Sequence, residues 1–167
     1  MAGGIQPGTC ATTTESDASE KRQIRLVEQV FNEASSDWSS KKSMPIEELI
    51  GQEAPYSLKK DGTSQEWKAD GGFVFYRDEC VGVIENKYQH SRQNACERVA
   101  KYLTCFKPHQ LFLSFEGPGF AKEDGGGSTG PMIDTLRHAG ATVLVNVLDD
   151  DEYERYLTEW MGRIKPT

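Results

Sequence analysis

Two acidic residues and one lysine in the middle of the chain have the types and spacing needed for phosphate-ester chemistry. Asp70 precedes an apolar run that starts at Phe73, while Glu85 and Lys87 lie two residues apart at the end of a second run. Residues two apart on a strand share a face. Two carboxylates at one sheet edge repel each other unless a cation lies between them, and hard oxygen ligands select Mg²⁺ or Mn²⁺. A protonated lysine beside them would orient a water molecule or stabilise a phosphoryl oxygen.

The acid-x-lysine pattern alone is a weak signal, because it occurs both at Glu66/Lys68 and at Glu85/Lys87. Only the second pair ends an apolar run and has an acid, Asp70, upstream across a turn. The alternative explanation is an ion pair between Glu85 and Lys87 at a sheet edge, which would contribute little to stability. The position of these charges at the end of the run Val81–Ile84 favours the site over the ion pair.

The elements that would position these side chains follow from the hydrophobic pattern. Two β-rich runs, 73–76 and 80–86, are separated by Arg77-Asp78-Glu79, which predicts a hairpin. Further strands are expected over 56–59, 110–115 and 141–147. Helical spacing and end signals predict helices over 19–35 (capped by Ser19), 45–50, 93–104, 131–139 and 150–164.

The order of these elements predicts the class of fold. A meander of about three strands is followed by helices and strands in alternation, which favours right-handed crossovers. We therefore expect an α/β fold of the mixed α+β kind, with a mixed central sheet flanked by helices. A chain of 167 residues is typical of one domain, expected over 19–167, with 1–18 as a flexible arm.

Charge is unevenly distributed along the chain. The net charge of −7 argues against a protein that coats nucleic acid by bulk electrostatics. The segment 87–107, however, contains five basic residues and one acid, Glu97, a local sum of +4. Acids gather instead over 149–159. Such segregation would attract phosphate to one face, although a solvated helix face explains it about as well.

The expected location is cytoplasmic, and no membrane contact is expected. The longest apolar runs, such as 111–115 and 141–148, are far shorter than the roughly 20 residues that cross a bilayer. The first residues lack the basic start and the apolar block of a secretory signal. The four cysteines form no CxxC pair, which favours free thiols in a reducing compartment.

Three short blocks in a fixed order resemble the PD-(D/E)XK nuclease superfamily, and in particular the EcoRI-like type II restriction endonucleases. The blocks are Asp70-Gly71-Gly72, Glu85-Asn86-Lys87-Tyr88-Gln89 and Asn94-Ala95-Cys96-Glu97-Arg98. A looser fourth block is Leu111-Phe112-Leu113 with Glu116-Gly117 shortly after it. Together they cover about residues 69–120.

This resemblance implies a restriction-endonuclease-like core and Mg²⁺-dependent hydrolysis of double-stranded DNA by a homodimer, at a short A/T-centred palindrome. Mn²⁺ is expected to substitute for Mg²⁺. Asp70, Glu85 and Lys87 would be catalytic, and Asn86 would join the two acids at the metal. The residues implied in DNA binding are Gln89, Arg92, Asn94, Ala95, Glu97 and Arg98. The side-chain chemistry agrees in part, because asparagine pairs with adenine and arginine with guanine.

The sequence also departs from the family pattern. Ala69 stands where the family has proline, Gln93 stands where it has glycine, and few residues separate Lys87 from Asn94, so an arm that wraps the duplex is expected to be missing. Two alternatives therefore stay open: a monomeric nicking, repair or phage nuclease of the same fold, and a catalytically silent DNA-binding protein. Glu28 is a further candidate acid for the metal site.

Overall fold

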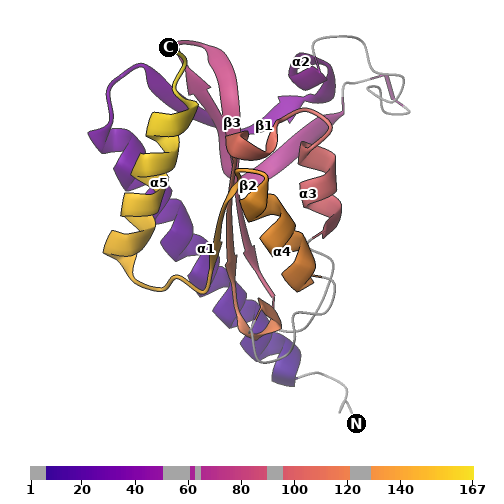
Figure 1. The fold of residues 1–167 in the computed structure, drawn as a ribbon. Coiled ribbons are helices and arrows are strands. Elements are labelled where there is room, and N and C mark those ends of the chain that lie inside the picture. The colour runs from indigo at the N-terminus through magenta and orange to yellow at the C-terminus, as the bar shows by residue number, and fades with distance from the viewer. Residues whose placement is uncertain (1–6, 51–60, 63–64, 90–95, 121–128) are drawn as a thin grey trace.

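One mixed sheet organises the part of the chain that the computed structural model describes, residues 7–50, 61–62, 65–89, 96–120 and 129–167 (Figure 1). The strands are β1 (Trp38–Pro45), β2 (Glu66–Tyr76), β3 (Glu79–Tyr88), β4 (Leu111–Glu116) and β5 (Thr142–Val145), adjacent in that order. β1, β2 and β3 pair antiparallel, whereas β3, β4 and β5 pair parallel. The expected mixed sheet is thus confirmed.

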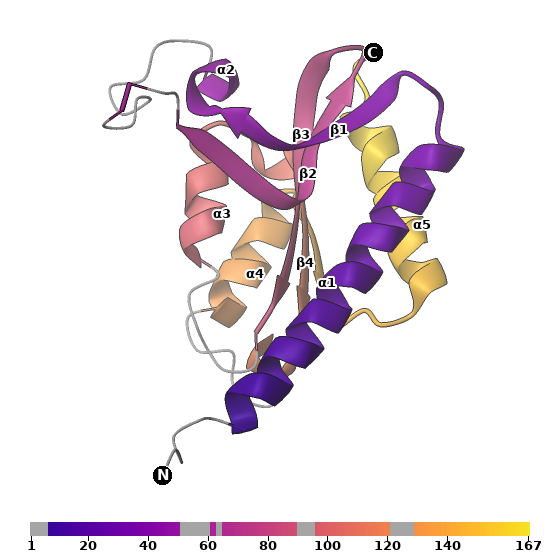
Figure 2. The same ribbon diagram turned by 180° about the vertical axis from the view of Figure 1, so that it is seen from behind.

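Helices cover both faces of this sheet (Figures 1 and 2). On one face lie α1 (Pro7–Glu33) and α5 (Asp150–Ile164), and on the other lie α3 (Cys96–Tyr102) and α4 (Thr129–His138). The short helix α2 (Ile46–Ile50) follows β1, and single 3₁₀ turns, η2 (Pro108–Gln110) and η3 (Pro118–Phe120), flank β4. None of the helices described combines the length and apolar composition needed to cross a membrane.

Two apolar cores result from the alternation of side chains along the central strands. Phe73 and Val83 pack in the core that α3 and α4 close, whereas Val74 and Ile84 pack in the core beneath α1 and α5. Trp160 of α5 is fully buried in the second core, and its indole N–H donates to the carbonyl of His109. Because both faces are covered, the central strands are continuous apolar runs rather than alternating ones.

Several elements confirm the expectations from sequence. β2 and β3 form the expected hairpin, whose two turn residues, Arg77 and Asp78, have φ values of 49° and 67°. Such a pair of positive φ angles matches the right-handed twist of the flanking strands. The last helix has its expected bounds, and the Asp149 side chain caps it by accepting from the amide of Glu152. α2, α3, α4, β4 and β5 fall within the expected segments or within two residues of them.

Other elements differ from expectation. α1 begins at Pro7, within the segment expected to be a flexible arm, so Ser19 lies inside the helix and does not cap it. The sequence does not predict β1, because half of its residues are polar and exposed, as an edge strand allows. The strand expected over 56–59 and the helix residues 93–95 lie outside the described residues.

β2 departs from regular pairing beside Asp70. Lys41 pairs with Phe73 and Ser43 pairs with Lys68, so Lys42 alone stands opposite the four residues 69–72. Gly72 has a φ of +105°, which side-chain-bearing residues rarely adopt. Gly71 lies so close to β3 that a Cβ built there would be 2.1 Å from the Cγ2 atom of Ile84. The two glycines therefore let the main chain of β2 bend against β3 at Asp70.

We predict that Gly71→Ala lowers the free energy of unfolding by about 1–3 kcal/mol, because the added methyl group overpacks the contact with Ile84. Urea denaturation followed by circular dichroism measures the change. Gly162→Ala on α5 is the matched control, since a Cβ there meets no atom within 4 Å, and it should leave stability unchanged or raise it. Equal stability of Gly71→Ala and the wild type would contradict this account of the bend.

Candidate functional site

The bend in β2 brings the carboxylates of Asp70 and Glu85 to one point. The amide of Asp70 donates to Oε2 of Glu85 over 3.3 Å, which ties the two strands together at the site. Arg98, on α3, places its Nη1 atom 2.8 Å from Oε1 of Glu85 and 3.6 Å from Oδ2 of Asp70. One cationic nitrogen therefore lies between the two acids, as the repulsion of paired carboxylates requires.

Glu85 is the buried member of this pair. Its side chain is 2% exposed, whereas that of Asp70 is 34% exposed. The hydroxyl of Tyr102, also on α3, lies 2.7 Å from Oε2 of Glu85 and donates to it. Burial raises the pKa of the Glu85 carboxyl, and the charge of Asp70 raises it further, while the hydrogen bonds and charge from Tyr102 and Arg98 oppose the shift. The carboxylate is thus held in the interior by two donors from one helix.

Lys87 lies two residues beyond Glu85 on β3 and lines a small hollow of about 80 Å³ together with Asp70. The hollow is bounded by α1, whose residues Ser16, Ser19, Glu20 and Gln23 line it. Among the described residues, no carboxylate lies within ion-pairing distance of the Lys87 ammonium group. This cation is therefore free to meet an anion or a water molecule beside Asp70.

Asp70 and Glu85, two of the three residues predicted to be catalytic, both contact Arg98, and the third, Lys87, lines a hollow with Asp70. Arg98 itself takes a position that differs from the prediction. Arg98 was expected to read a base in the major groove, and its guanidinium group instead contacts Glu85 and Asp70. The reason is the packing of α3, which buries Val99 and Tyr102 against the sheet and turns Arg98 toward the acids.

Two other predicted site residues are buried. Oδ1 of Asn86 accepts from the hydroxyl of Tyr153 on α5, so this oxygen is already engaged, while the residue lines the hollow with Asp70. Gln89 is 7% exposed, and its backbone bonds to Glu116 and Gly119. Strand alternation explains the first case, since neighbours on β3 point to opposite faces.

The remaining DNA-binding predictions are not placed by the structure. Arg92, Asn94 and Ala95 lie outside the described residues, as does the side chain of Glu97. Glu28, the further candidate acid, lines a separate groove between α1 and β1. A different acid of α1, Glu20, lines the hollow with Asp70, and the sequence analysis did not name it.

The sequence also missed the roles of Tyr102 and Arg98 toward Glu85. Helical spacing over 93–104 includes Tyr102 but assigns it no role at the acids. A signal existed, because residues four apart on a helix lie on the same side, so an arginine at 98 and a tyrosine at 102 present two donors together. Only the position of α3 against β3 shows what those donors contact.

The donor set fits a divalent cation. The acids that hold Arg98 are hard oxygen ligands, and Mg²⁺ binds through one or two carboxylates together with water and phosphate oxygens. The Nη1 atom of Arg98 shows that both carboxylates can face one positive centre. No cluster of three or more histidine, cysteine or acidic side chains occurs in the described part of the chain, so protein ligands alone would not complete the coordination.

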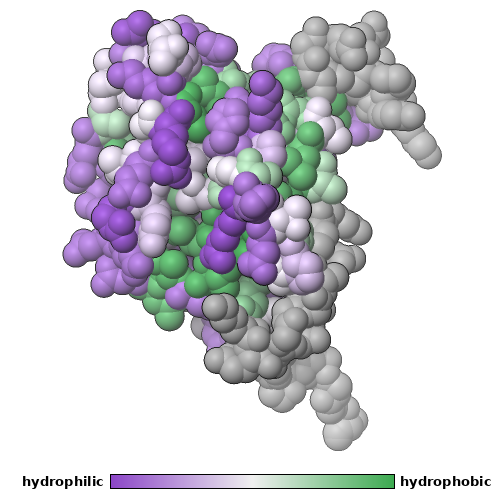
Figure 3. Space-filling model, in the orientation of Figure 1, coloured by the Kyte–Doolittle hydropathy of each residue, from purple (hydrophilic) through white to green (hydrophobic). Residues whose placement is uncertain are grey.

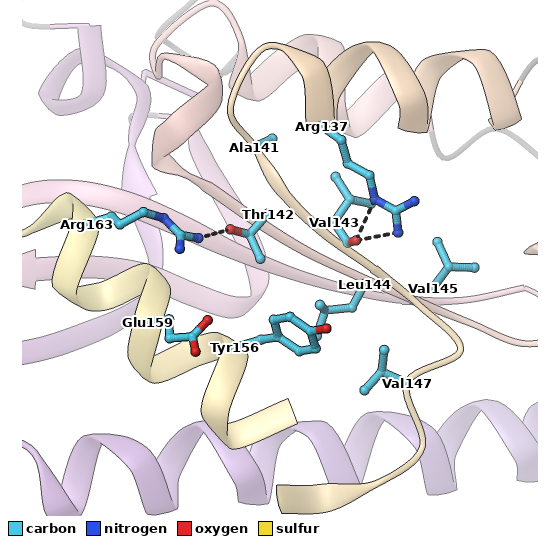
Figure 4. A pocket seen from close by; sticks show the side chains of 10 residues that line it. All are labelled: Arg137, Ala141, Thr142, Val143, Leu144, Val145, Val147, Tyr156, Glu159 and Arg163. Atoms are coloured by element: carbon cyan, nitrogen blue, oxygen red, sulfur yellow. Dashed lines mark hydrogen bonds between the residues drawn. The ribbon is translucent and has the colours of Figure 1, made fainter. Parts of the chain in front are cut away.

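A larger hollow lies at the free edge of β5, away from the acids. Figure 3 shows apolar surface there between the more hydrophilic surfaces of α5 and α4. Its cations are already engaged: the guanidinium of Arg137 donates to the carbonyl of Val143, and that of Arg163 donates to Oγ1 of Thr142 (Figure 4). Such contacts protect an edge strand and assemble no reactive group.

In comparisons with known proteins, the chain matches no family model, no curated protein and no solved structure. The function proposed below therefore depends on the residues of the site.

We predict that the pKa of Glu85 makes stability depend on pH. Because the folded pKa is above the ordinary value of 4.5, the folded protein binds this proton more tightly than the unfolded chain does. The contribution to stability is complete below pH 4.5 and is lost as the pH rises through the folded pKa. Glu85→Gln removes this titration, so the stability of the wild type minus that of the variant should fall as the pH rises from 4 to 7. Denaturation curves at several pH values test this; a difference that grows with pH would contradict it.

Proposed function

We propose that the chain is a Mg²⁺-dependent nuclease that hydrolyses phosphodiester bonds of double-stranded DNA. The observation that carries this proposal is the convergence of Asp70 and Glu85 on one cationic position, with Lys87 lining the same hollow as Asp70. Paired carboxylates and a lysine are the groups that metal-assisted phosphoryl transfer needs. The likeness of the three sequence blocks to EcoRI-like restriction endonucleases supports the same function.

The chain's own residues would divide the chemistry among them. Asp70 and Glu85 would hold the cation, and Tyr102 would keep the Glu85 carboxylate in place. When bound there, Mg²⁺ would screen the charge of the phosphodiester and make a coordinated water more acidic. Lys87 would orient the attacking water and stabilise charge on the non-bridging oxygens. The water oxygen bonds to phosphorus as the bond to one deoxyribose oxygen breaks on the opposite side. The attacking water gives up a proton to solvent, and the leaving oxygen takes one from solvent and departs as a hydroxyl group.

Arg98 must move when a metal binds, because its guanidinium group lies between the same two carboxylates. Its side chain is 45% exposed, so it can turn toward solvent without unpacking α3. Once displaced, it adds a positive charge at the edge of the site, where the phosphate of a substrate would neutralise it.

Cutting both strands requires two active sites, and we propose a homodimer whose two-fold axis coincides with that of a palindromic DNA site. Cytoplasmic location, an A/T-centred target and activity with Mn²⁺ belong to the same proposal. A monomer that nicks one strand is the alternative within this fold. A plasmid digest separates the two, since a palindrome cutter produces linear fragments with discrete ends and a nicking enzyme produces open circles.

We predict that Asp70→Asn and Lys87→Met each reduce Mg²⁺-dependent plasmid cleavage by at least about 100-fold, because the first removes a charged ligand of the cation and the second removes the charge that acts on the reacting phosphate. Circular dichroism should show both variants folded. Asp78→Asn, in the exposed hairpin turn, is the matched control and should cleave like the wild type. Undiminished cleavage by Asp70→Asn or by Lys87→Met would remove the proposed site.

A catalytically silent DNA-binding protein is the second candidate, and the Arg98 contacts favour it: an acid pair already neutralised by a protein cation has no need of a metal. This candidate is supported if the wild type binds DNA but does not cleave it with Mg²⁺ or Mn²⁺ at any concentration.

Arg98→Gln tests how Arg98 and the metal share the acids. We predict that this variant binds Mn²⁺ several-fold more tightly than the wild type, because the competing positive charge has gone. Isothermal calorimetry without DNA measures the affinity, and Arg155→Gln, on the exposed face of α5, is the control. Weaker Mn²⁺ binding by Arg98→Gln would show that Arg98 supports the metal site and does not compete with it.

A further inference from the structure

Lys42 stands at the irregularity in β1–β2 pairing and contacts the main chain of Asp70. It is the one residue of β1 between the regular pairs of Lys41 and Ser43. Irregularities of this kind redirect a side chain and are frequent beside active sites. Here the ammonium of Lys42 donates to the carbonyl oxygen of Asp70 over 3.0 Å. The same distortion that turns Asp70 toward Glu85 thus places a cation on the other side of Asp70.

This cation has capacity for a further ligand. An ammonium group has three donors, and the contact with Asp70 uses one of them. Among the residues that the structure describes, no carboxylate lies within ion-pairing distance of Lys42, and the side chain is exposed. Two donors of Lys42 therefore face solvent.

Lys42 also lines a groove that contains Ile24 and Gly71, the chain neighbours of Gln23 and Asp70 in the small hollow of Lys87. The groove, of about 360 Å³, lies between α1 and β1, and Gly71 and Lys42 form its boundary toward the acids. Asp70 lines the 80 Å³ hollow and its neighbour Gly71 lines the groove. Unpaired lysines thus lie on both sides of Asp70, Lys87 toward the hollow and Lys42 toward the groove.

We propose that Lys42 binds a backbone phosphate of the DNA strand adjacent to the phosphate that is cleaved. This inference rests on the proposed nuclease function. A nucleic acid strand carries a negative charge at every nucleotide, so a strand that places one phosphate at Lys87 brings the next ones past the neighbouring surface. Lysine contacts phosphate as a point charge, without reading the base. Lys42 is therefore a substrate-binding residue that adds affinity without sequence preference.

The neighbouring Lys41 provides a matched control. Its ammonium lies 4.9 Å from the centroid of the Phe75 ring, a residue of the core beneath α3 and α4. Lys41 is exposed like Lys42, but it sits at a regular pair with Phe73 and has no contact with Asp70. The two variants Lys41→Met and Lys42→Met change the net charge equally and differ only in where the charge is lost.

The experiment is DNA binding by fluorescence anisotropy in EDTA, with several unrelated duplexes and a series of KCl concentrations. Lys42→Met should lose about eight-fold in affinity for every duplex at about 0.1 M salt, and the slope of log K against log salt should shrink by about 0.9. Lys42→Arg should keep most of the wild-type affinity, and Lys41→Met should keep the wild-type slope.

Three results would overturn the inference, and they are distinguishable. If Lys42→Met keeps the wild-type slope while Asp70→Asn abolishes cleavage, the Lys42 contact fails and the nuclease function stands. If Lys42→Met lowers the melting temperature without changing the slope, Lys42 only supports the strand irregularity. If the wild type binds no duplex even at low salt and cleaves none, the nuclease function fails, and the role of Lys42 fails with it.

Discussion

The burial of the Glu85 carboxylate is the constraint on which the site depends. A charge taken out of water must be paired and hydrogen-bonded, and Glu85 receives donors from Arg98, Tyr102 and the amide of Asp70. Two of these come from α3 and one from β2, so the carboxylate joins the helix to the hairpin. Its raised pKa shows that the donors offset the cost of burial only in part. In the proposed function, Mg²⁺ would replace the guanidinium group of Arg98 at this carboxylate and would bring a higher charge.

The irregularity in β2 is the second structural requirement, and it interrupts the regular pairing of β2 with β1. Four residues of β2 stand opposite Lys42, and the bend depends on glycine at two of them. Because of this irregularity, Asp70 both contacts Arg98 and lines the hollow with Lys87. Distortions of this kind persist where the surrounding structure is rigid, and here β2 is fixed by strands on both sides and by packing on both faces.

The helix α1 is fixed against the sheet close to the site, because Glu116 pairs with Tyr88, the residue after Lys87. Its Arg22 contacts Glu116, at the end of β4, and Asp150, at the start of α5, while Ser19 donates to the same Glu116 carboxylate. These contacts fix α1 along the sheet so that it forms one wall of both the hollow and the groove beside Asp70. In a chain with a net charge of −7, Lys42 and Lys87 thus line the two surfaces that adjoin Asp70, as the proposed binding of an anionic polymer requires.

The sequence determined much of this protein through local and periodic signals. Apolar runs predicted the central strands, and the polar residues Arg77 and Asp78 between two such runs predicted the hairpin turn. Helical spacing predicted α5 with its bounds. Each of these signals is encoded within a few neighbouring residues. Sequence also predicted Asp70, Glu85 and Lys87 as a group, and the structure places Asp70 against Arg98 with Glu85 and in one hollow with Lys87. Tertiary structure alone decided that Arg98 lies on the acids, that Asn86 faces α5, and that a polar segment forms β1 and brings Lys42 to Asp70. Those outcomes depend on which helix packs on which face and on how an edge strand pairs, and neither is encoded in the spacing of nearby residues.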